Sequence, residues 1–243
     1  MIKLNSVNKR YSGTLILEDI SFNLKNGKSL SIIGPSGCGK TTILYMIAGL
    51  IKPSSGTILL NGKEIKEPDS RTAFILQDYG LLPWKTVIEN VSLGMKIKKY
   101  PEQKIDSTAE RILADLGIFT HKDKYPATLS GGEKQRVAIA RALSTEPAIL
   151  LMDEPFSSLD TLTREKLQQA IYDIHEKRSL TLITVTHSIE EAVFLGDTIL
   201  VMTGGPGKII STIDNSSRRK KDFRNSKEFY SVCGSIRGMI GSL

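Results

Sequence analysis

One stretch of the sequence combines the residue types that bind phosphate. It reads Gly34-Pro35-Ser36-Gly37-Cys38-Gly39-Lys40-Thr41-Thr42, which has the spacing of a phosphate-binding loop. Glycines let the backbone curl until successive N–H groups point at phosphate oxygens, and the positive end of a following helix adds to the attraction. Lys40 is placed to reach the β- and γ-phosphates, and the Thr41 hydroxyl is placed to hold Mg²⁺. These residues predict a site for a nucleoside triphosphate.

The residues on either side supply the strand and the helix that such a loop requires. Ser29–Ile33 reads as a buried strand, and Thr42–Leu50 reads as a helix with an apolar side. A glycine-rich turn that matched the pattern by chance would not need a strand before it and a helix after it. The context therefore favours phosphate binding over a coincidental match.

Three further predicted strands end in polar side chains, and parallel strands finish at one rim of a sheet. The strands are Ala148–Met152, Leu182–Thr186 and Thr72–Leu76. The first ends in Asp153, placed to orient Mg²⁺, and Glu154, placed to polarise the water that attacks the γ-phosphate. His187 follows the second strand as a candidate γ-phosphate sensor, and Gln77 closes the third, where its amide oxygen can ligate Mg²⁺ or hold the water. Solvated strand ends, and a structural role for His187, are the alternatives.

A second candidate anion site lies about ninety residues after Lys40, at Leu129–Arg136. Ser130 suits a helix N-cap, and Gly131 and Gly132 expose backbone N–H groups at the start of a helix that continues through Val137–Leu143. An ordinary capped helix would look the same. The residues alone leave both interpretations open.

Composition limits the class of protein. The chain has 243 residues, of which 40% are hydrophobic and 24% charged, as in an ordinary soluble globular protein. No apolar run approaches the length of a membrane span, and the N-terminal residues lack the apolar core of a signal peptide. The only cysteines are Cys38 and Cys233, which argues against a disulfide framework and for a reducing cytosol.

The net charge of +7 is concentrated near the C-terminus. More than half of the excess lies in residues 214–243, whose basic members are Arg218, Arg219, Lys220, Lys221, Arg224, Lys227 and Arg237. A solvated basic tail is the favoured interpretation, and contact with anionic lipid or a membrane partner is the alternative. No base-reading module is present, so we expect no nucleic-acid partner.

The pattern of apolar residues divides the chain into blocks. Alternation in the first thirty residues predicts antiparallel strands, and 87–143 has helical periodicity, with a stop at Gly117. The continuous apolar runs before Asp153 and His187 predict a parallel sheet covered on both faces. We therefore expect an α/β fold of the P-loop NTPase type, with an antiparallel β-subdomain and an inserted α-helical subdomain at about 86–145. The domain would span 1–213, followed by the basic tail at 214–243.

The order of these motifs resembles that of the ATP-binding subunits of ABC transporters, over about Ile2–Ile213. Leu129–Arg136 resembles the signature sequence of that family, and Ser157–Asp160 resembles the loop after its second carboxylate motif. The resemblance implies that two subunits sandwich two ATP molecules, and that Asp160 reaches across the dimer. It further implies that Ser130, Gly131, Gly132 and Glu133 meet the γ-phosphate held by the partner's Lys40. Glu133 stands where Gln is most frequent, and Tyr11 stands where the family stacks an aromatic ring on adenine.

A narrower resemblance concerns the segment Gln77–Trp84, which is similar to that of nitrate, sulfonate and taurine importers. In that group the segment lines the groove that receives the permease. Trp84 and Leu82 would then be exposed for docking, or else packed inside the helical subdomain. The implied partners are a second copy of the chain, two transmembrane permease subunits and, indirectly, a substrate-binding protein. The implied location is peripheral, on the cytoplasmic face of the cell membrane.

Three rival functions remain at this stage. An exporter ATPase is disfavoured only by the Gln77–Trp84 segment and by the residues after His187. A non-transport ABC ATPase would carry a long coiled coil or a second cassette, and neither is present. A small-molecule kinase would leave Leu129–Arg136 and Asp160 without a role. The sequence does not identify the cargo, because the cargo would not touch this subunit.

Overall fold

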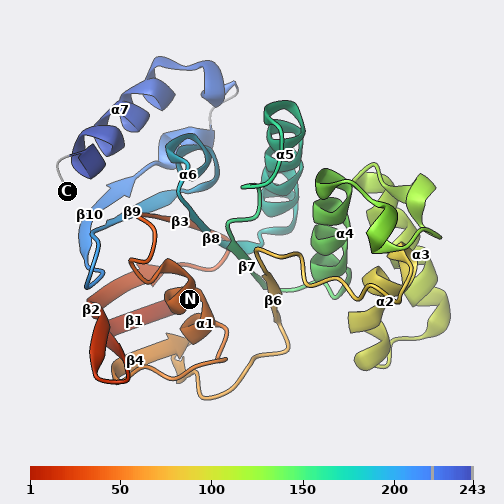
Figure 1. The fold of residues 1–243 in the computed structure, drawn as a ribbon, viewed down its shortest axis with the longest axis horizontal. Coiled ribbons are helices and arrows are strands. Elements are labelled where there is room, and N and C mark those ends of the chain that lie inside the picture. The colour runs from red at the N-terminus through yellow and green to blue at the C-terminus, as the bar shows by residue number, and fades with distance from the viewer. Residues whose placement is uncertain (220–221, 242–243) are drawn as a thin grey trace.

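The computed structural model describes residues 1–219 and 222–241 and is built around a six-stranded sheet (Figure 1). Its strand order is β10-β9-β3-β8-β7-β6, in which the last five strands are parallel and β10 is antiparallel to β9. The strands are β3 Ser29–Ile33, β6 Thr72–Ile75, β7 Ile149–Asp153, β8 Thr181–Thr186, β9 Thr198–Met202 and β10 Ile209–Asp214. Every residue of β3, β7 and β8 is buried, which explains their continuous apolar runs.

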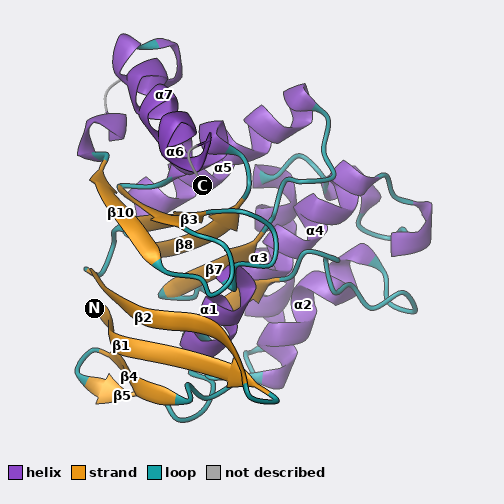
Figure 2. Cartoon of the chain, turned by 60° about the vertical axis from the view of Figure 1, so that its left-hand side comes forward, coloured by secondary structure: helices purple, strands orange, loops and turns teal. Residues whose placement is uncertain are grey.

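A second, antiparallel sheet lies beside the first, as expected from the alternation near the N-terminus. Its order is β2-β1-β4-β5, made of β1 Ile2–Tyr11, β2 Thr14–Leu24, β4 Ser55–Leu60 and β5 Lys63–Glu64. Helix α1, Lys40–Ile47, lies between the two sheets and shares one core cluster with both of them (Figure 2). It begins two residues earlier than expected, because Gly39 serves as its N-cap in the left-handed region.

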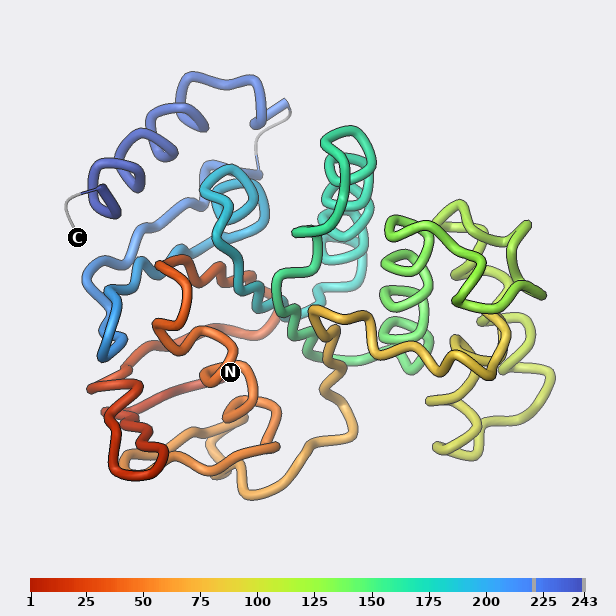
Figure 3. Tube along the Cα trace, in the orientation of Figure 1, coloured from red at the N-terminus to blue at the C-terminus, as the bar shows by residue number. Residues whose placement is uncertain are grey.

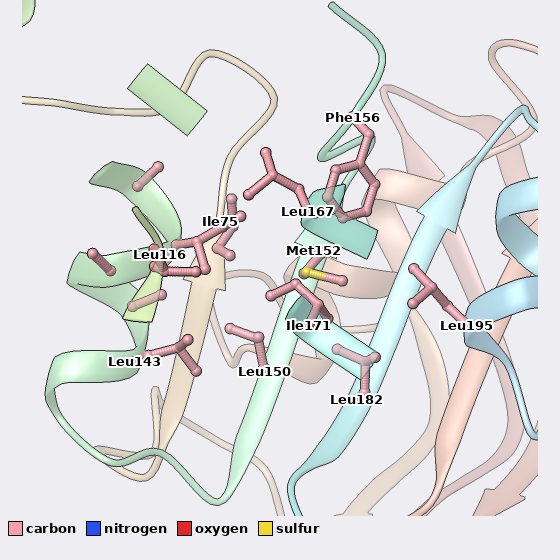
Figure 4. Packing of buried hydrophobic residues seen from close by; sticks show 14 of the residues in the cluster. Ile75, Leu116, Leu143, Leu150, Met152, Phe156, Leu167, Ile171, Leu182 and Leu195 are labelled. Carbon is pink, nitrogen blue, oxygen red and sulfur yellow. The ribbon is translucent and has the colours of Figure 1, made fainter. Parts of the chain in front are cut away.

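The predicted helical subdomain is present as a separate group of helices on one side of the molecule (Figure 3). It contains α2 Val87–Ile97, α3 Glu102–Asp115 and α4 Gly131–Ser144, with short 3₁₀ turns at η1 Phe119–His121 and η2 Pro126–Thr128. The expected apolar face of α3 is buried, and Gly117 follows that helix with a φ of 65°. The packing of this group continues into the main core, as the neighbouring Ile75, Leu116 and Leu143 show (Figure 4).

Two helices connect the remaining strands. Helix α5, Thr161–Arg178, joins β7 to β8 and buries Leu167 and Ile171 against the sheet, near Met152 of β7 (Figure 4). It begins after Asp160, whose Oδ1 accepts a hydrogen bond from the Thr163 N–H at 3.0 Å. The short helix α6, Ile189–Leu195, follows β8 directly.

The C-terminal residues differ from the solvated tail that their charge suggested. They form η3 Ser216–Arg219, η4 Phe223–Asn225 and α7 Lys227–Gly241, and α7 packs against α6 (Figure 1). Arg218 is only 1% exposed. Lys220 and Lys221, which contribute to the basic excess, lie outside the described residues.

The buried Arg218 is held by an acidic partner in the main domain. Its Nε donates to Asp197 Oδ1 at 3.1 Å, and one Nη donates to Ser29 Oγ at 2.9 Å. Burial by itself would raise the pKa of Asp197, but the hydrogen bond from Arg219 and the charge of Arg218 outweigh it and hold that pKa well below its usual range. The segment after β10 is therefore anchored to the start of β3.

We expect Arg218→Met to destabilise the protein. Asp197 keeps its hydrogen bonds from Arg219 but loses the one that the buried Arg218 donates, and a lost hydrogen bond to a buried charged group costs about 2 kcal/mol. Urea unfolding followed by circular dichroism measures the change. Arg237→Ala is the matched control, because its ion pair with Glu190 is solvent-exposed and should contribute about 1 kcal/mol or less. Equal losses for the two variants would contradict an anchoring role for Arg218.

Candidate functional site

The loop between β3 and α1 has the conformation that phosphate binding requires. Gly37 and Gly39 have φ values of 77° and 94°. A Cβ added at Gly39 would lie 2.6 Å from the Leu17 side chain, so no larger residue fits there. Gly39 caps α1 without a side-chain hydrogen bond, which leaves the first N–H groups of the helix available to an anion.

The Lys40 ammonium lies inside the curl of this loop. It donates to the carbonyl oxygens of Gly34 and Pro35, both at 2.9 Å, and the residue is 5% exposed. The Cys38 sulfur lies 3.9 Å from the Lys40 ammonium nitrogen, and burial raises the pKa of the Cys38 thiol. The positive charge is thus held at the centre of the candidate phosphate site.

Two of the predicted magnesium ligands are adjacent. The Thr41 hydroxyl donates to Asp153 Oδ1 at 3.0 Å, and Asp153 ends β7 with 4% exposure. Burial raises the pKa of Asp153, while the Thr41 hydrogen bond and the charge of Lys40 oppose that rise. A hydroxyl and a carboxylate are oxygen ligands of the kind that Mg²⁺ prefers. Gln77, the third predicted ligand, is exposed beyond the end of β6, the strand next to β7.

Glu154 and His187 meet at the ends of neighbouring strands. His187 Nδ1 lies 3.2 Å from Glu154 Oε2. Glu154 has a φ of 45°, and its N–H donates to the Val185 carbonyl at 2.9 Å, which turns the chain at the end of β7. Both side chains remain partly accessible, at 21% for Glu154 and 58% for His187. The pair is therefore open to water and to a phosphate at the rim of the sheet.

The start of α4 forms a separate cavity of about 430 Å³. Ser130 is the N-cap, and its N–H and hydroxyl both donate to Glu133 Oε2, at 2.7 and 2.8 Å. The hydrogen bond from the Ser130 backbone is the main reason why the pKa of Glu133 is lowered. Gly131, Gly132 and Asp160 also line this cavity, whereas no residue of the Lys40 loop does. Within one chain the two candidate anion sites do not meet.

Two predicted contacts with nucleotide or permease lie at the surface. Tyr11, at the end of β1, is 45% exposed, with the Lys9 ammonium 4.9 Å from its ring centre. Trp84 is 69% exposed, so it does not pack inside the helical subdomain. Leu82 is partly buried beside it.

Two features of the site were not predicted from the sequence. His121 Nε2 lies 3.1 Å from Glu133 Oε1, so an imidazole faces the carboxylate at the signature-like turn. Glu191 in α6 is buried, and burial raises its pKa to about 8. The contact between His121 and Glu133 joins separate elements, so no local pattern predicts it. Glu191 lies in the first turn of α6, and its burial follows from the packing of that helix.

Comparison with known proteins places the chain in a family. The ABC transporter family model matches residues 17–157. An ABC transporter ATP-binding protein of Methanocaldococcus jannaschii is 43% identical over 88% of this chain and 79% of its own length. The aliphatic sulfonates import ATP-binding protein of Bacillus cereus is 41% identical over 95% of this chain and 92% of its own, and the taurine import ATP-binding protein of Roseobacter denitrificans is 44% identical over 79% and 72%.

Solved structures agree with this assignment. A dimeric ATP-binding cassette in a post-hydrolysis state, bound to ADP and Pi, has a TM-score of 0.80 and 32% identity, covering 88% of this chain and 99% of its own. The chain belongs to the ABC transporter family, and its fold is that of a P-loop ABC ATPase. None of the described helices has the length and hydropathy needed to cross a bilayer.

We expect the buried Glu191 carboxyl to make stability depend on pH. Its pKa of about 8 exceeds the ordinary 4.5, so the folded protein keeps a proton that the unfolded chain loses between these values. Its contribution to stability is therefore full below pH 4.5 and is lost as pH rises through 8, with a slope of up to about 1.4 kcal/mol per pH unit. Glu191→Gln should remove that slope between pH 5 and 8, as measured by urea unfolding.

The control for this measurement is Glu190→Gln, because Glu190 is an exposed neighbour in the same helix. The comparison is between the slopes of variant and wild type, since histidines contribute equally to both. An unchanged slope in Glu191→Gln, or an equal change in both variants, would contradict the role given to burial.

Proposed function

We propose that this protein is the ATP-binding and ATP-hydrolysing subunit of an importer, and that two copies work beneath two permease subunits. The observation that carries this proposal is the division of the site. One edge of the sheet carries Lys40, Asp153 and Glu154, whereas Ser130 lines a cavity that includes none of these three residues. A phosphate loop and an anion-binding helix start that remain apart in one chain can meet between two chains. The dimeric form of the similar cassette supports this arrangement.

In the proposed reaction the chain's own residues bind ATP and move one proton. Lys40 exchanges its two carbonyl partners for phosphate oxygens, and Tyr11 stacks on adenine. Glu154 accepts a proton from water, whose oxygen attacks the γ-phosphorus while the bond to the β–γ bridging oxygen breaks and ADP leaves with the electron pair. His187, already 3.2 Å from Glu154, orients that carboxylate at the γ-phosphate.

Mg²⁺ fits the oxygen pair of Thr41 and Asp153, with Gln77 as a third candidate ligand. When bound, the cation supplies positive charge against the phosphates.

From the second copy, Ser130, Gly131 and Gly132 would donate to the γ-phosphate, and Glu133 would hold Ser130 in position. Asp160 would cross the interface. The phosphate loop contributes Gly34 through Thr42, with Cys38 as a spacer.

The permease partner is proposed from the surface around Gln77–Trp84. Trp84 is a large apolar side chain exposed beside the helical subdomain, as a docking surface requires. This contact would hold the protein at the cytoplasmic face of the membrane. The names of the relatives favour import of a small sulfonate, taurine or nitrate-type solute delivered by a substrate-binding protein.

The proposed division is a cassette at 1–213, with helices at about 86–145, and a C-terminal segment at 214–243.

We expect Glu154→Gln to bind ATP and to lose turnover. The amide keeps the shape of the side chain but cannot accept the proton, so the rate should fall by roughly 10²-fold or more. The variant should also accumulate an ATP-bound dimer, visible by size-exclusion chromatography. Lys40→Ala is the contrasting variant, because it should lose nucleotide affinity itself. Hydrolysis by Glu154→Gln at the wild-type rate would remove Glu154 from the role of base.

We expect Trp84→Ala to lose binding to the permease subunits co-expressed from neighbouring genes. The measurement is the amount of permease that co-purifies with the tagged protein in detergent. Ile97→Ala is the control, because Ile97 is 71% exposed at the opposite end of α2 and should leave the complex intact. An undiminished complex with Trp84→Ala would rule out this docking surface.

A further inference from the structure

Tyr79 lies in a strained turn just after Gln77, between β6 and α2. Tyr79 and Gly80 have φ values of 60° and 59°, so the chain passes through the left-handed region at two successive residues. For a residue with a Cβ this conformation costs roughly 1–2 kcal/mol. Such a turn persists only where surrounding contacts hold it.

The backbone of the turn is held by Arg141 of α4. One Nη donates to the Gly80 carbonyl at 2.7 Å, and the other donates to the Tyr79 carbonyl at 2.9 Å. Both carbonyls can face the same guanidinium because of the left-handed turn between them. The Gln77 loop is thereby attached to the helix that begins at Ser130.

The side chain of Tyr79 makes the second attachment. Its hydroxyl lies 2.6 Å from Ser158 Oγ, and a Cβ added at Gly131 would lie 3.4 Å from the same hydroxyl. The ring also packs against the main core. One phenol therefore bonds to the loop after Glu154 and lies beside the glycine turn at the start of α4.

Ser158 is connected back to Glu154 by a short chain. The Ser157 hydroxyl and N–H both donate to the Glu154 carbonyl, at 3.1 and 3.3 Å, and Arg164 donates to the Leu159 carbonyl at 2.7 Å. The loop 157–160 is thus held at both ends. Ser158 therefore lies between two residues, Ser157 and Leu159, whose positions are fixed by hydrogen bonds.

We propose that Tyr79 is a positioning residue for ATP hydrolysis, whose hydroxyl ties the Gln77 loop to Ser158 so that this loop and the loop following Glu154 move as one unit. This proposal rests on the proposed roles of Glu154 and of the permease-facing segment. The hydroxyl of Tyr79 bonds to Ser158, whereas the Thr41 hydroxyl bonds to Asp153, so the two hydrogen bonds share no residue. Loss of its hydroxyl should therefore lower kcat and leave nucleotide affinity unchanged.

The test is a double-mutant cycle in the purified full-length protein, with Tyr79→Phe, Ser158→Ala and the two combined. Each single variant should lose roughly three- to tenfold in kcat for Mg-ATP, the effect of one hydrogen bond. The double variant should lose no more than either single one. The Kd for ATP should stay at the wild-type value, and the Tm should fall by no more than about 4 °C, the effect of one lost hydrogen bond in a chain of this size. Tyr230→Phe is the matched control, because Tyr230 is 63% exposed in α7, far along the chain from these loops.

Hydrogen exchange provides a readout that a local packing defect would not change. Ser158→Ala should speed amide exchange at 80–82, and Tyr79→Phe should speed it at 157–159, although each substitution is distant in sequence from the segment measured. Additive losses in kcat, wild-type kcat in Tyr79→Phe, or exchange that changes only beside the substituted residue would overturn the proposal. These results are separable from the base role of Glu154, which the Glu154→Gln variant tests on its own.

Discussion

The structure depends on one constraint, the parallel register of β3, β8, β7 and β6. Ile33 pairs with Thr186, Asp153 with Val185, and Ile75 with Met152. Neighbouring strands lie about 4.8 Å apart, so the residues that follow these pairs are brought to one edge of the sheet. Lys40, Glu154, His187 and Gln77 all follow strand ends. Their proximity is therefore a property of the sheet, and it needs no contact among the loops themselves.

The same constraint explains how much of the site the sequence reveals. An apolar run that ends in Asp153 and Glu154 or in His187 predicts a buried strand that ends in polar side chains, and every residue of β7 and β8 is buried. The phosphate loop was predicted because its glycines, Lys40 and Thr41 have a fixed spacing. The N-cap role of Ser130 was predicted because a serine followed by glycines at a helix start is a local pattern, and Ser130 does cap α4. In each case the information lies within about ten consecutive residues.

Contacts between distant segments have no such local pattern, so the sequence does not predict them. Tyr79 bonds to Ser158, and His121 to Glu133, but neither pair has a spacing that predicts contact. Arg218 was assigned to a solvated tail because composition gives the sign of a charge and not the place of its partner. Its partner Ser29 begins β3, and its partner Asp197 directly precedes β9. Only the folded chain brings these residues together. Packing inside the helical subdomain was the alternative to a docking role for Trp84, and the exposure of its side chain rules out that alternative.

The turn at Ser130 gives a physical reason to expect that a single cassette would hydrolyse ATP slowly. In the free chain, both donors of Ser130 already bond to the Glu133 carboxylate, and His121 lies 3.1 Å from its other oxygen. In the proposed dimer, a γ-phosphate bound by the second copy would replace Glu133 as the acceptor for the Ser130 hydroxyl, while the Ser130 N–H would keep its hydrogen bond to Glu133. Since the capping box stabilises the helix start, this exchange is favourable only for an acceptor of higher negative charge, as ATP presents. On the proposed arrangement, closure of two chains would depend on nucleotide, because without nucleotide the Ser130 donors keep their hydrogen bonds to Glu133 of the same chain.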